Sequence, residues 1–116
     1  MTIALIIIGS FLGLAATVSA FGKLSKMPDA IAPLEHVGVK SSQIPLLAVL
    51  ELLGALGILL GIWSKPLGVA ATIGFSLYFL GAVGVHLRVK DAVKDFAPAL
   101  FLFALSVVTL ILELKR

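Results

Sequence analysis

Four long apolar segments alternate with short polar connections along the chain. The apolar segments cover residues 2–22, 45–63, 66–87 and 96–114. An α-helix rises about 1.5 Å per residue, so about 20 residues cross a hydrocarbon layer of about 30 Å. Short connections make consecutive helices antiparallel neighbours. The pattern therefore predicts an all-α integral membrane protein, one transmembrane domain over residues 1–116 built as an antiparallel four-helix bundle.

The first connection, residues 22–43, differs from the others because it is long. It carries Pro28 and Pro33 around a short stretch in which apolar and charged residues alternate. This composition predicts a short amphipathic helix lying at the membrane surface between helices 1 and 2. His36 belongs to this stretch, and no second histidine or carboxylate stands at metal-ligand spacing around it. We therefore expect no metal site.

Composition supports a membrane protein. The chain is 60% hydrophobic and 13% charged, whereas soluble domains are about 25% charged. The net charge of +3 is spread over loops and one end, which is typical of membrane flanks and predicts no nucleic-acid partner. The chain has no cysteine, which excludes disulfides, thiol catalysis and thiolate metal sites.

The two ends of the chain carry weaker signals. Residues 18–20 resemble a signal-peptide cleavage site, but no basic residue precedes the first apolar segment, which favours a membrane-spanning helix. Glu113, Lys115 and Arg116 are expected to be anchors whose charges reach the membrane surface. Six cations on the side of the two charged loops, against three on the other side, favour cytoplasmic loops with both termini outside.

Glu51 is the exceptional residue, because it lies inside the second apolar segment. A carboxylate at the centre of a membrane helix costs about 2.5–3.5 kcal/mol on insertion scales, so it usually has a partner or a function. Helical periodicity places Gly54 and Ala55 on the same face as Glu51. These small residues leave space for either another helix or a ligand.

Aromatic residues follow one face of the third segment. Phe75, Phe79 and His86 share a stripe on a helical period, and Tyr78 lies beside it. Such a stripe is consistent with ordinary core packing and also with a slot for a flat ring. Core packing is the more frequent explanation of such a stripe, and the histidine at its end strengthens the case for a slot.

The antiparallel order brings several polar residues to one side of the membrane. The ends of segments one and three and the starts of segments two and four meet there, with Lys23, Glu51, His86, Arg88 and Asp95. We expect Glu51 to pair with Lys23, His86 or Arg88. The cluster either fixes the helix register or forms a functional site.

Several motifs follow one another along the chain: Gly22-Lys23-Leu24, the proline-containing loop ending near Gly38, residues 50–61, Gly81-Ala82 before His86-Leu87-Arg88, and Pro98-Ala99-Leu100. In this order and spacing they resemble the DoxX-like family of small four-helix membrane proteins, over nearly the whole chain. The resemblance implies a multi-pass protein of the bacterial or archaeal inner membrane, or a eukaryotic relative. The family takes its name from the membrane subunit of a thiosulfate:quinone oxidoreductase, and it includes proteins proposed in oxidative-stress complexes and a branch resembling receptor-assembly chaperones. Its polar positions fall on Lys23, Glu51, His86 and Arg88.

Two classes of function follow. The first is a redox-associated subunit that binds a quinone or another lipophilic molecule, with Glu51 and His86 as catalytic groups. It would depend on a redox partner protein for electron transfer, because the chain has no haem, flavin or iron–sulfur ligation pattern and no covalently bound cofactor is expected. The second is a non-enzymatic assembly or scaffold protein, for which Gly-rich helix faces would bind partner helices or a second copy in a homodimer. Membrane lipids are expected partners in both. The expected ligand-binding residues are Lys23, Gly54, Ala55, Phe75, Tyr78, Phe79 and Arg88.

Overall fold

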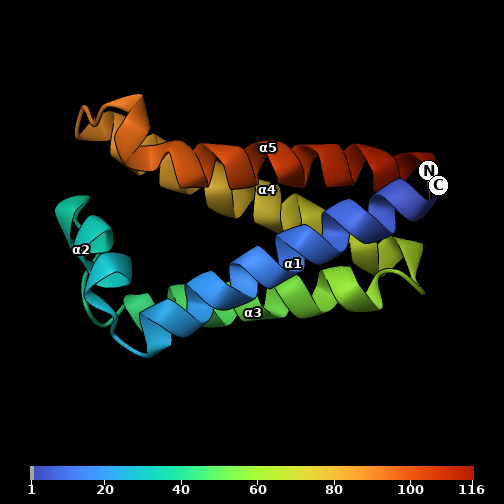
Figure 1. The fold of residues 1–116 in the computed structure, drawn as a ribbon, viewed down its shortest axis with the longest axis horizontal. Helices are drawn as coiled ribbons and strands as arrows, with labels where there is room; N and C mark the ends of the chain where they lie inside the picture. The colour runs from blue at the N-terminus through green and yellow to red at the C-terminus, as the bar shows by residue number, and fades with distance from the viewer. Residues whose placement is uncertain (1) are drawn as a thin grey trace.

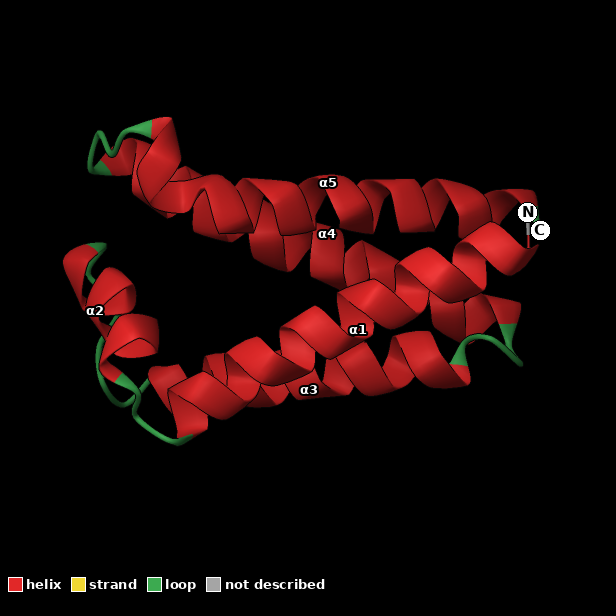
Figure 2. Ribbon diagram, viewed as in Figure 1, coloured by secondary structure: helices red, strands yellow, loops and turns green. Residues whose placement is uncertain are grey.

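The computed structural model describes residues 2–116, which contain five helices and no strand (Figure 2). Met1, the first residue of the predicted domain, lies outside the described residues. The predicted all-α class is confirmed, and so is a separate short helix after the first segment. The helices are α1 Thr2–Leu24, α2 Pro28–His36, α3 Ile44–Leu60, α4 Lys65–Arg88 and α5 Val93–Lys115.

The four long helices run up and down the molecule (Figure 1). Helix α1 packs on α3, α3 on α4, α4 on α5 and α5 back on α1, so each long helix has two neighbours among the others. The short helix α2 contacts α1 and lies at the opposite end from both termini. The pairs α1–α3 and α4–α5 diverge toward the end that α2 covers.

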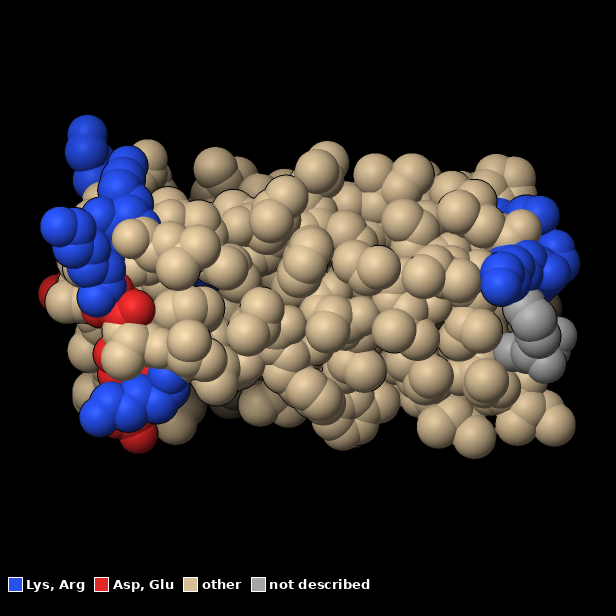
Figure 3. Space-filling view, turned by 90° about the horizontal axis from the view of Figure 1, so that it is seen from above, with Lys and Arg blue, Asp and Glu red and all other residues tan. Residues whose placement is uncertain are grey.

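Three helices are long and apolar enough to cross a membrane: α1, α4 and α5. Helix α3 is equally apolar but has 17 residues. Charged side chains gather at the two ends of the molecule and leave an uncharged band between them (Figure 3). Many large apolar side chains point outward from this band, including Ile7, Leu53 and Leu77, as expected of a surface that contacts lipid tails.

The two largest differences between predicted and observed helix boundaries have local causes, and the other boundaries differ by at most two residues. Helix α3 ends at Leu60, whereas the apolar pattern continues to Trp63, because the backbone turns at Gly61 toward the start of α4. Helix α5 begins at Val93 and contains non-helical dihedral angles at Phe96, where the sequence predicted its start. Pro98 explains this kink, since it has no N–H to continue the hydrogen-bond ladder.

The core lies where the long helices meet. Leu12 and Ala16 of α1 pack against Ala55 and Ile58 of α3 and against the aromatic rings of α4. At the end near the termini, α3 and α4 approach to backbone contact, because a Cβ atom on Gly61 would lie 2.5 Å from the Cα of Gly68. This close approach holds the two helices together at one end while the opposite end opens.

Candidate functional site

Helix α3 places Glu51 in the interior, with 0% of its surface exposed. The Nζ of Lys23 on α1 donates to its Oε1 at 2.5 Å and also to the Oγ of Ser19 at 2.7 Å. The Ser19 hydroxyl donates to the same Oε1 at 3.3 Å. Ser19 and Lys23 are one helical turn apart, so both reach one point on α3. The expected pairing of Glu51 is therefore confirmed for Lys23.

The second carboxylate oxygen of Glu51 has a different environment. Within residues 2–116, Oε2 is fully buried and no group satisfies the geometry of a hydrogen bond to it. The hydroxyl of Tyr78 on α4 nevertheless lies close enough to the Glu51 carboxylate to interact with it. A buried acceptor without a partner costs about 1–3 kcal/mol, and natural proteins have few of them. Glu51 borders a cavity of about 270 Å³. This oxygen is therefore an acceptor that a molecule in the cavity could use.

The cavity lies between the diverging helix pairs at the α2 end. Tyr78, Phe79, Ala82 and His86 of α4 form one wall. Residues of α2 cover it as a roof, and residues from the start of α5 close the remaining side. The lining from the other helices consists of Ser19 and Lys23 of α1, Asp29, Ala30, Pro33 and Leu34 of α2, and Asp95, Phe96, Pro98, Ala99 and Leu102 of α5.

Some rings of the predicted aromatic stripe line the cavity, and another lies in the core. The rings of Tyr78 and Phe79 lie edge to face with centroids 5.1 Å apart, and both line the cavity. Phe75 is instead buried over Gly54, whose Cβ would lie 2.5 Å from its ring. Ala55 is buried in the core as well. The space below Glu51 at Gly54 is thus filled by a side chain of the protein.

His86 lines the same cavity as Glu51 and bonds to a residue that the sequence analysis did not single out. Its Nδ1 lies 2.7 Å from Oδ2 of Asp91, while Oδ1 of Asp91 lies 2.7 Å from Nε2 of His36. The hydrogen bonds from His86 and His36 lower the pKa of Asp91 below its ordinary value. The His86 ring also stacks on Phe96 at 5.6 Å. One carboxylate therefore joins α2 to the end of α4.

Helix α2 is held over the cavity by few contacts. Besides His36, the Val37 carbonyl accepts a hydrogen bond from the exposed Arg88 at 3.5 Å. Arg88 therefore lies outside the Glu51 cavity, which it does not line, and at the edge of the α2 roof. Asp95 caps the start of α5, since its Oδ2 accepts from the backbone N–H of Ala92 at 3.1 Å.

A second buried carboxylate lies at the other end of the molecule. The expectation that Glu113 is an exposed anchor is wrong, because only 3% of its surface is exposed. It packs where Gly68 has no side chain, and Nε of Arg116 lies 3.5 Å from its Oε2. Arg116 also donates to the carbonyl oxygens of Gly61 and Ile62. The spacing of Ser106, Thr109 and Glu113, three and four residues apart on one helix face, is the sequence signal for this burial.

Across residues 2–116, no group of three histidine or acidic side chains is arranged to hold a metal ion.

Comparison with known proteins gives one positive result. No curated protein and no solved structure matches the chain. The sequence pattern of the DoxX-like family matches residues 7–109, which run from the first turns of α1 into the second half of α5. The chain therefore belongs to the DoxX-like family.

Proposed function

We propose that this protein binds a lipophilic ring molecule, such as a quinone, in the cavity beneath α2, as a redox-associated membrane subunit. The observation that carries the proposal is the buried Glu51 beside a cavity walled by Tyr78 and Phe79, because no group is in hydrogen-bond geometry with its Oε2 and the Tyr78 hydroxyl lies near the same carboxylate. Aromatic walls favour a flat ring, and a buried acceptor favours a hydroxyl or N–H on that ring. The volume suits a ring headgroup, since it is slightly below the range of drug-sized pockets.

The proposal includes an arrangement in a membrane. Helices α1, α4 and α5 are long enough to cross, and α3 is proposed as the fourth crossing of a four-helix bundle. Helix α2 would then lie at the interface, with its charged residues toward water. The site would open near the surface of a bacterial or archaeal cell membrane, where both lipophilic molecules and protons are available.

The two proposed catalytic groups act as bases toward a reduced ring. If Nδ1 of His86 donates its proton to Asp91, Nε2 keeps a lone pair. Oε2 of Glu51 is a second acceptor on the same cavity. Oxidation of a quinol releases two electrons and two protons. A redox partner protein would take the electrons, while Glu51 and His86 take the protons.

Ligand titration tests this function. Added quinol, kept in its reduced form, should raise the melting temperature of the purified wild type, and the rise should be much smaller in Phe79→Ala and His86→Ala. Phe101→Ala is the matched control, because Phe101 is exposed on α5 and pairs with Phe11 away from the cavity. Equal shifts in Phe79→Ala and Phe101→Ala, or no shift in the wild type, would contradict the proposal. A Glu51→Gln protein with unchanged binding and complex activity would remove the catalytic role of the carboxylate.

One observation favours the assembly protein as a second candidate. Gly74, Gly81 and Gly84 lie exposed on α4, and a Cβ at each would meet nothing within 4 Å. Small residues on an outward face let another helix approach closely in a membrane. Cross-linking in native membranes should then trap one reproducible larger partner. Recovery of self-dimers alone would count against this candidate.

A further inference from the structure

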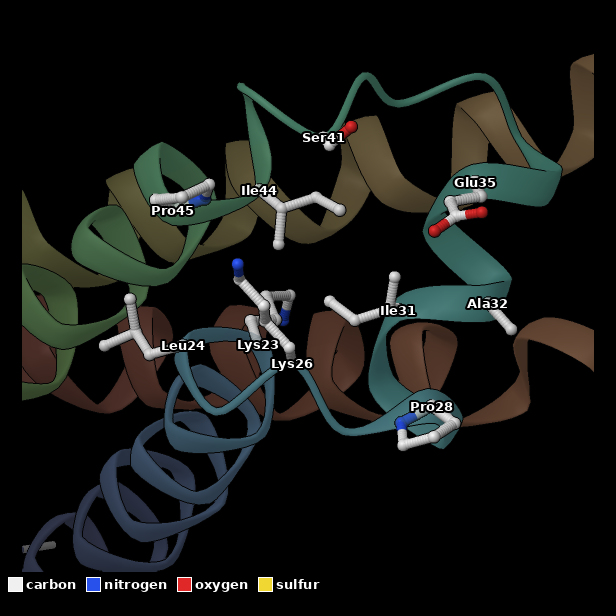
Figure 4. A pocket seen from close by; sticks show the side chains of 10 residues that line it. All are labelled: Lys23, Leu24, Lys26, Pro28, Ile31, Ala32, Glu35, Ser41, Ile44 and Pro45. Atoms are coloured by element: carbon white, nitrogen blue, oxygen red, sulfur yellow. The ribbon is translucent and has the colours of Figure 1, made fainter.

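A second, larger pocket lies between the end of α1, helix α2 and the start of α3 (Figure 4). Its volume is about 440 Å³. Ile31 of α2 and Ile44 of α3 face each other across it, and Glu35 reaches in from α2. The complete lining is Lys23, Leu24, Lys26, Pro28, Ile31, Ala32, Glu35, Ser41, Ile44 and Pro45.

The lining combines an apolar floor with a charged rim. The floor consists of aliphatic and proline side chains from all three helices. The rim carries the cations Lys23 and Lys26, the carboxylate of Glu35 and the hydroxyl of Ser41. Within the described chain, neither Lys26 nor Glu35 takes part in an ion pair. The pocket lies against α2 (Figure 4), at the end of the molecule opposite the termini (Figure 1).

This chemistry suits an anionic amphiphile better than a wholly apolar molecule. Lys23 is already paired with Glu51, so the ammonium group of Lys26 is the rim cation that attracts a phosphate, with Lys23 beside it. The carboxylate of Glu35 would accept hydrogen bonds from hydroxyl groups next to that phosphate, and the hydroxyl of Ser41 would donate one to them. A hydrocarbon chain would lie along Leu24, Ile44 and Pro45. A phospholipid with a hydroxylated headgroup has all three parts.

We propose that this pocket is a binding site for an anionic phospholipid of the phosphatidylglycerol type, with its phosphate held by Lys26 and Lys23. Lys23 gives the site a connection to the interior, because it lines both this pocket and the Glu51 cavity. The lipid phosphate and Glu51 therefore share one ammonium group. Binding of the lipid draws Lys23 toward the membrane surface and loosens its hold on Oε1 of Glu51. The proposal does not depend on a quinone in the inner cavity.

Two lysines with the same backbone conformation provide a matched test. Lys26 and Lys90 both adopt positive φ, 56° and 60°, after the long helices α1 and α4, but only Lys26 lines the pocket. Asparagine tolerates this conformation, so Lys26→Asn and Lys90→Asn remove one charge each without new strain. Both also lose the same general attraction to an anionic bilayer. A difference between them therefore reports the pocket.

The measurement is lipid retention by native mass spectrometry after release from nanodiscs of mixed phosphatidylglycerol and phosphatidylcholine. Wild type and Lys90→Asn should retain one phosphatidylglycerol, and Lys26→Asn should bind it about fivefold more weakly, as expected for loss of one lysine near an anionic headgroup. Glu35→Gln should weaken the binding of phosphatidylglycerol more than the binding of a phosphate monoester lipid, which has no glycerol hydroxyls. Equal retention by the two lysine variants would overturn the proposal. Complete displacement of phosphatidylglycerol from the wild type by inorganic phosphate alone would also overturn it, because the site would then bind free phosphate.

Discussion

The ring of Phe75 on α4 occupies the space that Gly54 leaves on α3, one turn below Glu51. A Cβ atom at Gly54 would lie 2.5, 2.9 and 2.9 Å from three ring carbons. Since Phe75 is only 2% exposed, the ring has little room to move. This contact closes the floor of the site and sets how closely α3 and α4 approach.

Gly54→Ala should therefore destabilise the protein, by about 1–3 kcal/mol, the usual cost of overpacking a core. Gly81→Ala is the control on α4, because nothing lies within 4 Å of its Cβ and alanine favours a helix more than glycine does. Unfolding of both variants in the same detergent provides the comparison. Equal stability of Gly54→Ala and Gly81→Ala would show that Phe75 does not fill this space.

The buried Lys23–Glu51 pair should respond asymmetrically to its two substitutions. Lys23→Gln leaves a buried carboxylate without its cation and should cost about 3–5 kcal/mol. Glu51→Gln should cost less, since the 8% exposed Lys23 lies at the edge of the second pocket and can turn toward its rim. The double variant should recover part of the loss. A double-mutant cycle on unfolding free energies measures the coupling, and additive effects would contradict a direct interaction.

Asp91 should make stability depend on acid pH. Its pKa is lower in the folded protein than in the unfolded chain, so the unfolded chain binds more protons as the pH falls. The stabilisation is complete above the ordinary pKa of an aspartate, about 4, and is lost as the pH falls through the lower folded value. Asp91→Asn should flatten this part of the profile. If the stability of Asp91→Asn falls at acid pH as it does in the wild type, the two histidines do not stabilise the charge of Asp91.

The α2 roof should control access to the Glu51 cavity. The natural chain has no cysteine, so a single Ala82→Cys substitution places one reactive thiol in the cavity wall. A membrane-permeant maleimide should label it slowly, and the labelling should become faster when His36→Ala removes the bond to Asp91. Gly81→Cys, exposed on the outer face of α4, is the control. If His36→Ala accelerates both thiols equally, the roof does not gate the cavity.

The cation of Arg116 should reduce the free-energy cost of burying the carboxylate of Glu113. Arg116→Gln removes the nearby cation and weakens the bonds to the carbonyl oxygens of Gly61 and Ile62 in the turn after α3, so unfolding should occur at lower temperature. Adding Glu113→Gln should restore part of the loss, because a neutral amide costs less to bury than an unpaired carboxylate. Thermal unfolding of the two proteins tests this. Absence of any recovery would assign the effect of Arg116 to the carbonyl contacts alone.

Several features of the site follow from short-range patterns. The apolar runs predict the long helices, the two prolines predict a separate α2, and the charge of Glu51 marks the buried pair with Lys23. The same patterns assign Gly54 and Phe75 equally well to a ligand slot or to the core. Periodicity specifies the face on which a residue lies but not what fills the space opposite that face.

The sequence by itself determined the all-helical class, the position of each long helix and the family, because these depend on local hydrophobicity and on the order of motifs. Only the tertiary structure decided that Phe75 fills the space at Gly54, that Glu113 is buried on Gly68, and that Asp91 joins two histidines. It also decided that Glu51, whose Oε2 is buried, borders a cavity under α2. These contacts join residues from different helices, and the angle at which helix pairs diverge depends on side-chain packing along their whole length.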